Sequence, residues 1–309
     1  MKTVYLNKFM SSVVTELEMN GQYGTAHVCG SVLRSVMAFG GEGLPVSGIT
    51  PLWLKAYEGY LLHKGGKGLA WNTVSTYMRM LQAVYNRAVA RKLAAFIPHQ
   101  FRDVFTGRKA DHRCVLERDD MQKLLVEREP DITSPGMAWA RACLELMFRF
   151  HGMPFVDLAH LRKSDLKDGY LTLRRRKTGM PLSARVDGRA MQLLERYRNR
   201  DDTSPYLLCF LDGNLEGMAA YRDYQRILRL LNSRLRALAL WKKVQGKVTS
   251  YSARHTWATV GRYCHIPIEV ISEGLGHASV TTTEGYMKGF GNSRMDRANK
   301  VIMNYIFKG

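Results

Sequence analysis

The sequence lacks an uninterrupted apolar run of roughly 18 residues, the minimum that suggests a membrane-spanning helix. Its first residues are not followed by the apolar core of a signal peptide. The five cysteines lie far apart, without a CxxC pair or the Cys/His spacing of a zinc site. These absences predict a cytoplasmic protein with no membrane contact, no disulfide framework and no structural zinc.

Acidic residues are scarce compared with basic ones. The chain holds 27 Asp and Glu against 46 Lys and Arg, which gives a net charge of +19. Both the first hundred residues and the remainder carry a positive excess. Because Lys and Arg displace counterions from phosphates, such a surface attracts polyanions. The composition favours nucleic-acid binding, and the alternative is a soluble basic protein without a polyanionic partner.

Residues 1–96 are predicted to form a helical domain. Apolar residues recur at helical spacing over 4–19 and 26–39. Thr50 followed by Pro51 predicts a helix start, and that helix extends to about residue 63. Asn72 is expected to cap a longer helix through about residue 92. Four helices with short connections predict a compact bundle.

Residues 97–113 are mixed and basic, and we expect them to bury little and to link the first domain to a second one at 114–309. Residues 170–177 have strand character, residues 178 and 179 turn, and 180–186 return, which predicts a β-hairpin. The fold class is therefore mainly α with a small β-hairpin or sheet. Helices in the second domain are expected at 117–128, 135–151, 154–162, 188–200, 219–240, 251–264 and 267–274.

Basic and aromatic side chains of the second domain recur in pairs that share a face. Arg175 and Lys177 lie on one face of the predicted strand, because side chains alternate along a strand. Tyr251 and Arg254 are three residues apart and lie on one helical face. For an arbitrary protein, the ordinary interpretation of such pairs is a solvated surface.

A histidine and a tyrosine follow near the end of the chain. His277 comes directly after Leu275 and Gly276, where a helix is expected to end. Tyr286 follows nine residues later, after a run of threonines at 281–283. Taken singly, a histidine at a helix end is usually a cap or a core residue, and a tyrosine usually serves packing.

In this order and spacing, the residues resemble the tyrosine recombinase (phage integrase) superfamily. The family pattern is an Arg, a Lys on a β-hairpin, His-x-x-Arg, a His in Leu-Gly-His and a Tyr about nine residues further on. The sequence matches this pattern at Lys177, Arg254, His277 and Tyr286. The first hundred residues are also similar to the helical, SAM-like core-binding domain of the family. The resemblance thus implies a core-binding domain followed by a catalytic domain.

The sequence departs from the family pattern at two positions. Pro154 stands where the first Arg belongs, two residues after Gly152, although the carboxylate expected three residues further on is present as Asp157. Tyr251 replaces the first member of His-x-x-Arg. The sequence is similar in these stretches to integrases of conjugative elements, which also lack the usual first Arg.

Two arginines are candidates to replace the missing one. Arg175 is expected on the same strand face as Lys177, and we favour it for that reason. Arg149 precedes Gly152 by about one helical turn and is the second candidate. The sequence leaves both open.

The resemblance implies a covalent mechanism on DNA. Tyr286 would attack a phosphodiester and form a 3′-phosphotyrosine, while Arg254 and Arg175 would stabilise the charge on the phosphate oxygens. His277 and Tyr251 would add hydrogen bonds to the same oxygens. Lys177 would act as the general acid for the departing 5′-hydroxyl. The energy of the phosphodiester bond is conserved in the phosphotyrosine. We therefore expect the reaction to use no cofactor, neither a metal ion nor ATP.

The expected partner is double-stranded DNA at specific recombination sites, bound by a homotetramer, with accessory DNA-bending proteins as further candidates. On the fourth helix, Asn72, Thr76 and Arg79 are candidate groove or phosphate contacts, and a solvated helix face is the alternative. Residues 295–307 have apolar spacing, and the resemblance implies packing on a neighbouring protomer; packing within the same chain is the alternative.

Two other activities compete with strand exchange. One is DNA relaxation by the same chemistry, as in a type IB topoisomerase, and the other is a catalytically impaired relic that only binds DNA. Within strand exchange, the helical region begins almost at the first residue, which leaves no arm-binding domain and favours inversion or excision over integration of a mobile element.

Overall fold

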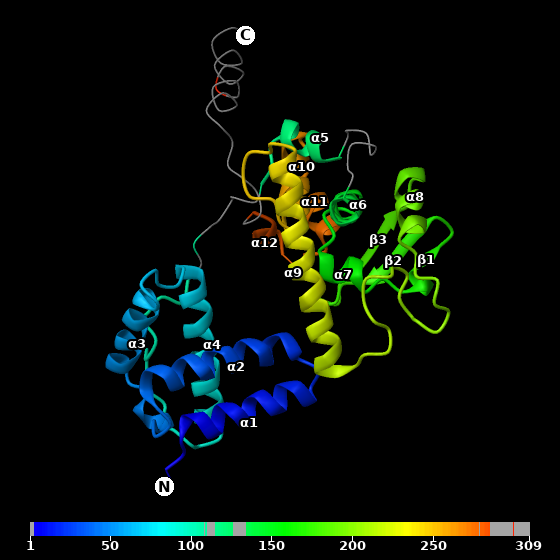
Figure 1. Ribbon diagram of the computed structural model, residues 1–309. Helices are drawn as coiled ribbons and strands as arrows, with labels where there is room; N and C mark the ends of the chain where they lie inside the picture. Colours follow the sequence, from blue (N-terminus) through cyan, green and yellow to red (C-terminus); the bar gives the residue numbers. More distant parts are fainter. Residues whose placement is uncertain are drawn as a thin grey trace. The chain divides into compact units, whose positions relative to one another are not determined.

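The structure, a computed structural model, describes residues 3–107, 109, 115–125, 134–277, 279–284 and 299. The chain divides into two compact units, one of residues 1–110 with 215–221 and one of residues 111–214 with 222–309. Among the described residues, helices dominate and the named strands form one small sheet (Figure 1). The predicted fold class, mainly α with a small sheet, is confirmed.

Unit 1 is built from four main helices. Apolar side chains at helical spacing, such as Met10 and Val13, form its core, and the first two helices run side by side (Figure 1). At the start of the third helix the Thr50 hydroxyl accepts a hydrogen bond from the Trp53 amide at 3.2 Å, and Pro51 follows the cap as predicted. The helices are α1 (Leu6–Met19), α2 (Tyr23–Gly40), α3 (Pro51–His63) and α4 (Trp71–Ala90).

The segment after α4 packs on unit 1 instead of forming an exposed linker. Phe101 and Val104 are buried in the core of the unit. The carboxylate of Glu58 accepts a hydrogen bond from the Phe105 amide at 2.7 Å. The prediction that residues 97–113 bury little is therefore wrong up to residue 107, because two apolar side chains complete a core that short helices leave open.

Asn72 does not cap α4. The helix begins at Trp71 after Ala70, which makes no side-chain cap. The Asn72 side chain instead donates to the Lys109 carbonyl at 2.9 Å and accepts from the Lys109 amide at 2.8 Å. An amide side chain matches a peptide group with one donor and one acceptor, so this contact fastens the segment beyond residue 97 to α4.

The sheet of unit 2 has three antiparallel strands in the order β1 (Leu166–Lys167), β2 (Tyr170–Arg174) and β3 (Pro181–Arg185). In its register Leu171 lies opposite Ala184, and both are buried. The predicted hairpin is confirmed, with a longer turn than expected. β2 ends at Arg174, so Arg175 and Lys177 lie in the turn, and the argument that placed them on one strand face is wrong.

Most of the remaining helices of unit 2 surround one apolar core, and a second, smaller cluster is formed by Ala258, Ile271 and Leu275. Most lie where periodicity predicts them, with ends that differ by a few residues; the short helix α12 after residue 279 is an addition, and 126–133 lie outside the described residues. They are α5 (Arg118–Leu125), α6 (Pro135–Arg149), α7 (Phe155–Ala159), α8 (Gly188–Arg196), α9 (Gly217–Trp241), α10 (Ser252–Tyr263), α11 (Ile268–Leu275) and α12 (Val280–Glu284).

The described residues contain neither a membrane-spanning helix nor a metal-binding cluster. None of their helices combines the length and the apolar character that crossing a membrane requires. They also hold no group of three or more His, Cys, Asp or Glu side chains arranged to bind a metal ion.

Candidate active site

Arg254 lies in the first turn of α10 and is 3% exposed. Its Nη1 donates to the Gly152 carbonyl at 3.0 Å and its Nη2 to the Leu275 carbonyl at 2.7 Å. Gly152 has a φ of +65°, and a Cβ there would come within 2.9 Å of the Arg254 Cα. The loop before α7 therefore needs a glycine in order to approach α10 and fix one edge of the guanidinium.

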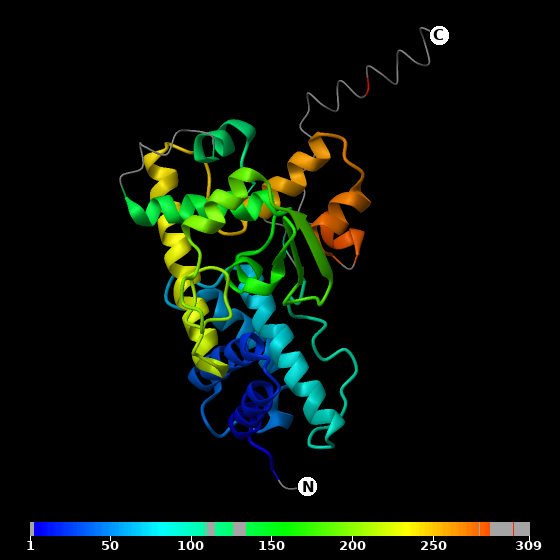
Figure 2. The same ribbon diagram turned by 90° about the vertical axis from the view of Figure 1, so that its right-hand side faces the viewer.

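Arg175, in the hairpin turn, is 5% exposed and reaches the same carbonyl. Its Nε donates to Asp157 Oδ2 at 2.5 Å, and its Nη1 donates to the oxygen of Leu275. The other oxygen of Asp157 accepts from the Arg176 amide at 2.9 Å. Figure 2 shows the green hairpin beside the orange helices α11 and α12, and Leu275 is the last residue of α11. The structure thus brings Arg175 and Arg254 together, because both donate to the same carbonyl oxygen, that of Leu275.

Gly276 permits this convergence. It ends α11 in the left-handed conformation with a φ of +62°. A Cβ at this position would lie 2.9 Å from Nη1 of Arg175. Any larger residue would therefore be strained in this left-handed backbone conformation, and its side chain would also displace the Arg175 guanidinium.

His277 follows directly and contacts Arg254. Its Nε2 lies 2.7 Å from Arg254 Nη2, and its Nδ1 lies 2.8 Å from the Thr283 hydroxyl on α12. The pKa of His277 is lowered to about 4, first by burial and then by the positive charges of Arg254, Arg175 and Lys177. The imidazole is therefore neutral at physiological pH.

The other predicted site residues differ in their placement. Lys177 is exposed in the hairpin turn, and its charge contributes to the low pKa of His277. Tyr251 stands at the N-terminus of α10 and is 52% exposed. Tyr286 lies outside the described residues, as does all of 295–307 except residue 299.

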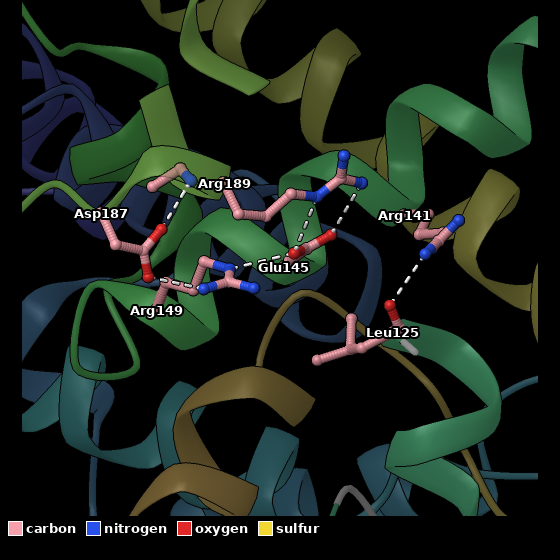
Figure 3. A network of polar contacts seen from close by, with 7 residues as sticks. Leu125, Arg141, Glu145, Arg149, Asp187 and Arg189 are labelled. Atoms are coloured by element: carbon pink, nitrogen blue, oxygen red, sulfur yellow. Dashed lines mark hydrogen bonds and ion pairs between the residues drawn. The ribbon is translucent and has the colours of Figure 1, made fainter. Parts of the chain in front are cut away.

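Arg149, the second candidate for the missing arginine, lies in a different cluster. Its Nε donates to Glu145 at 2.9 Å and its Nη1 to Asp187 at 2.6 Å (Figure 3). Arg189 donates to the same Glu145 carboxylate at 3.3 Å. Arg149 is therefore held by two carboxylates, and the contacts that define the Arg254 cluster do not include it.

The three candidate DNA contacts of unit 1 lie on α4. The side chain of Asn72 is engaged by the Lys109 backbone, and the Thr76 hydroxyl donates to the Asn72 carbonyl at 2.8 Å. Arg79 is exposed. Contact with DNA stays a prediction for all three residues.

The arrangement of Arg175, Arg254 and His277 suits an anion with several oxygens. The two guanidinium groups are planar donors with fixed directions. Some of their N–H groups donate to uncharged backbone carbonyl oxygens. Sequence inspection missed Leu275 and Thr283 as partners. No residue pattern marks a backbone carbonyl as a shared acceptor, and Thr283 sits in a run of three threonines of which it alone is fully buried.

Comparison with known proteins gives matches over both units. Residues 5–102 match the phage integrase SAM-like domain, and residues 114–290 match the phage integrase family. A curated relative, tyrosine recombinase XerA from Pyrococcus furiosus, is 29% identical over 140 residues, which is 44% of this chain and 46% of XerA. The chain thus spans about half the length of this relative.

Solved structures share the fold. The Tn1549 transposon integrase in complex with transposon right end DNA has a TM-score of 0.66 at 15% identity, over 99% of this chain and all of the other. A lambda integrase tetramer bound to a Holliday junction has a TM-score of 0.60 at 15% identity, over 93% of this chain and 78% of the other. At these identities the likeness concerns the fold alone.

Proposed function

This chain belongs to the phage integrase family, and from that premise we propose that it cuts and rejoins DNA through a 3′-phosphotyrosine intermediate on Tyr286. One observation carries the proposal beyond family membership. Where the family's first arginine is replaced by Pro154, a second buried guanidinium, that of Arg175, stands beside Arg254 on the Leu275 carbonyl. A two-arginine phosphate site is thereby restored with an arginine from another element.

The reaction places negative charge on the non-bridging oxygens of the scissile phosphate. Arg254 and Arg175 are held before DNA arrives, so they stabilise that charge without reorganising. The Tyr286 hydroxyl releases its proton to solvent and its oxygen forms a bond to phosphorus, while the bond from phosphorus to the 5′ oxygen breaks. Lys177 gives a proton to the departing 5′ oxygen, and its exposed place in the turn allows it to approach the DNA.

The rejoining step reverses these events. A 5′-hydroxyl from the partner strand attacks the phosphotyrosine, Lys177 takes up the proton of that hydroxyl, and the tyrosine leaves and regains a proton from solvent. Tyr251, half-exposed at the start of α10, would donate a hydrogen bond to the phosphate in place of the usual histidine. Since the phosphotyrosine conserves the bond energy, the proposed reaction uses neither ATP nor a metal ion.

The proposed substrate is double-stranded DNA at specific recombination sites. In the division that we propose, residues 1–96, with the segment up to residue 107 that packs on them, bind DNA, and residues 114–309 carry the chemistry. A solved lambda integrase is a tetramer on a Holliday junction, which supports a homotetramer on two DNA sites here. Inversion, excision and mobile-element integration all use this chemistry, and we propose that the reaction takes place in the cytoplasm.

The first test is covalent capture on a nicked suicide duplex selected by binding from a random pool. The wild type should form a protein–DNA adduct, and Tyr286→Phe should bind the same duplex and form none, because the attacking oxygen is gone. Tyr170→Phe, which removes a hydroxyl from an exposed tyrosine of β2, is the matched control and should behave as wild type.

Each contrary result identifies an alternative. A wild type that binds the duplex but forms no adduct would be a DNA-binding relic. Supercoil relaxation without recombinant product would indicate a topoisomerase. An adduct that persists in Tyr286→Phe would overturn the assignment of the nucleophile.

A further inference from the structure

We propose that Trp257 is a positioning residue for Arg254, because its indole ring packs against both chain segments whose carbonyl oxygens hold that guanidinium. Trp257 lies in α10, three residues after Arg254. Its ring fixes the carbonyls of Gly152 and Leu275 relative to each other, and it acts on the phosphate only through Arg254. The effect on the reaction rests on the proposed DNA cleavage, whereas the effect on the guanidinium does not.

The first of these segments is the turn between α6 and α7. His151 begins the turn, and the centroids of the His151 and Trp257 rings lie 5.6 Å apart. His151 has a φ of +56°, a left-handed conformation that is unfavourable for a residue other than glycine, and Gly152 follows with a φ of +65°. In this conformation the Gly152 carbonyl accepts from Nη1 of Arg254 at 3.0 Å. The indole ring thus packs on the residue whose backbone conformation sets the turn.

The second segment is the last turn of α11. Gly274 precedes Leu275, whose carbonyl accepts from Nη2 of Arg254 at 2.7 Å. A Cβ at Gly274 would lie 2.8 Å from Cη2 of Trp257 and 3.7 Å from the Cβ of His151. The far edge of the indole therefore packs directly on the Gly274 backbone, close to His151. Because Gly274 is helical, this close approach, and not an unusual backbone conformation, accounts for the glycine.

Each segment carries its carbonyl at the residue next to the one that touches the indole ring. A guanidinium is planar, so Nη1 and Nη2 of Arg254 both donate with good geometry only while the carbonyls of Gly152 and Leu275 keep a fixed separation. A shift of the Trp257 ring would move one carbonyl relative to the other and turn the guanidinium. Since the Leu275 carbonyl also accepts from Arg175, the shift would reach both arginines of the site.

Two single variants disturb the contact in opposite ways. Gly274→Ala adds a methyl group that displaces the ring, and Trp257→Phe removes the edge of the ring that reaches Gly274. Each should form the covalent adduct about tenfold to a hundredfold more slowly at unchanged DNA affinity, since a displacement of about 1 Å has a cost of that order. The combined variant should return to within about threefold of the wild-type rate, because the methyl group fills volume that the smaller ring leaves.

Gly261→Ala is the matched control for these measurements. It also adds a methyl group between α10 and α11, where a Cβ would lie 3.1 Å from Cδ1 of Ile271, and it leaves the contact between Trp257 and Gly274 in place. Gly261→Ala should keep the wild-type rate. Equal slowing by the two alanine substitutions would show that crowding of the helices is enough, and it would refute the role of Trp257. A combined variant as slow as the product of its two single effects would refute it as well.

Nitrogen-15 NMR of the DNA-free full chain tests the effect on Arg254 directly. Rotation about the bond between Nε and Cζ exchanges Nη1 and Nη2, and it should be slow in the wild type because the two nitrogens donate to different carbonyls. Arg254→Lys identifies the signals. The exchange should be faster in Gly274→Ala and slow again in the combined variant, and equal exchange in Gly274→Ala and wild type would overturn the proposal. If the wild type forms no adduct, the proposed function fails, while this measurement still decides whether Trp257 positions Arg254.

Discussion

Two arginine clusters of unit 2 look alike in sequence and differ in what holds them. Arg175 and Arg254 are almost fully buried, and both donate to the carbonyl of Leu275. Arg149, by contrast, has a side chain that is 33% exposed and lies between the carboxylates of Glu145 and Asp187 (Figure 3). The first cluster relies largely on uncharged acceptors and the second on carboxylates.

This difference is the one that we expect between a phosphate site and a structural network. A guanidinium held by carbonyl oxygens keeps its positive charge available for an incoming phosphate. A guanidinium held by two carboxylates is already neutralised, and binding a phosphate would require it to give up those partners. Arg175 differs from Arg149 in having one carboxylate partner instead of two, since Asp157 holds its Nε while its Nη1 donates to the Leu275 carbonyl.

The largest expected effect comes from removing one arginine from each cluster. Arg175→Ala should slow covalent adduct formation by about a hundredfold to a thousandfold, the usual cost of losing one preorganised donor to an oxyanion. Arg149→Ala should stay within about threefold of wild type, because its loss leaves both guanidinium groups of the site in place. Initial rates on the suicide duplex measure both, and the opposite ranking would transfer the role to Arg149.

A smaller effect is expected from removing one carboxylate of each cluster. Asp157→Ala should lower the free energy of unfolding by about 3 kcal/mol or more, because it leaves the buried charge of Arg175 without its partner. Glu145→Gln should cost about 1 kcal/mol, because the side chains of Arg149 and Arg189 are about one third exposed and water screens them.

Urea denaturation of both variants measures this contrast. Covalent capture at a temperature where each stays folded supplies the second readout. Asp157→Ala should also slow adduct formation, since Arg175 loses the contact that directs it, whereas Glu145→Gln should not. Equal losses of stability would show that burial does not distinguish the two clusters.

The smallest expected effect is a pH dependence of stability at His277. Its pKa is about 4 in the folded chain, against about 6.5 for an unfolded histidine. As pH falls below about 6.5 the unfolded chain binds the proton first, so stability decreases down to about pH 4 and this contribution then levels off. The free energy of unfolding should therefore fall less steeply over this range in His277→Gln than in the wild type.

His160 provides a matched control for that measurement. Its pKa is also lowered to about 4, chiefly by burial and then by the charge of Arg176. His160→Gln should flatten the same part of the stability profile and leave adduct formation unchanged, whereas His277→Gln should affect both. A profile for His277→Gln parallel to that of wild type would contradict the low pKa.

Much of the fold could be predicted, because local sequence patterns are enough to indicate its helices and its hairpin. The four helices of unit 1 follow from helical apolar spacing and from the cap formed by Thr50 and Pro51. The hairpin follows from strand character on both sides of a turn. The length of that turn could not be predicted, because Arg175 leaves the strand to reach Asp157, and a contact 18 residues away in sequence decides it.

The sequence by itself determined the helical fold, the hairpin and the order of Lys177, Arg254, His277 and Tyr286, since spacing and residue type are enough for these. Tertiary structure alone decided which arginine joins Arg254. Strand alternation favoured Arg175 over Arg149, but Arg175 lies beyond the end of β2, so it is the packing of α7, α10 and α11 around the Leu275 carbonyl that separates the two arginines. Every residue carries a backbone carbonyl oxygen, so residue types do not indicate which carbonyl becomes a shared acceptor. Only the contacts between distant segments of the chain show it.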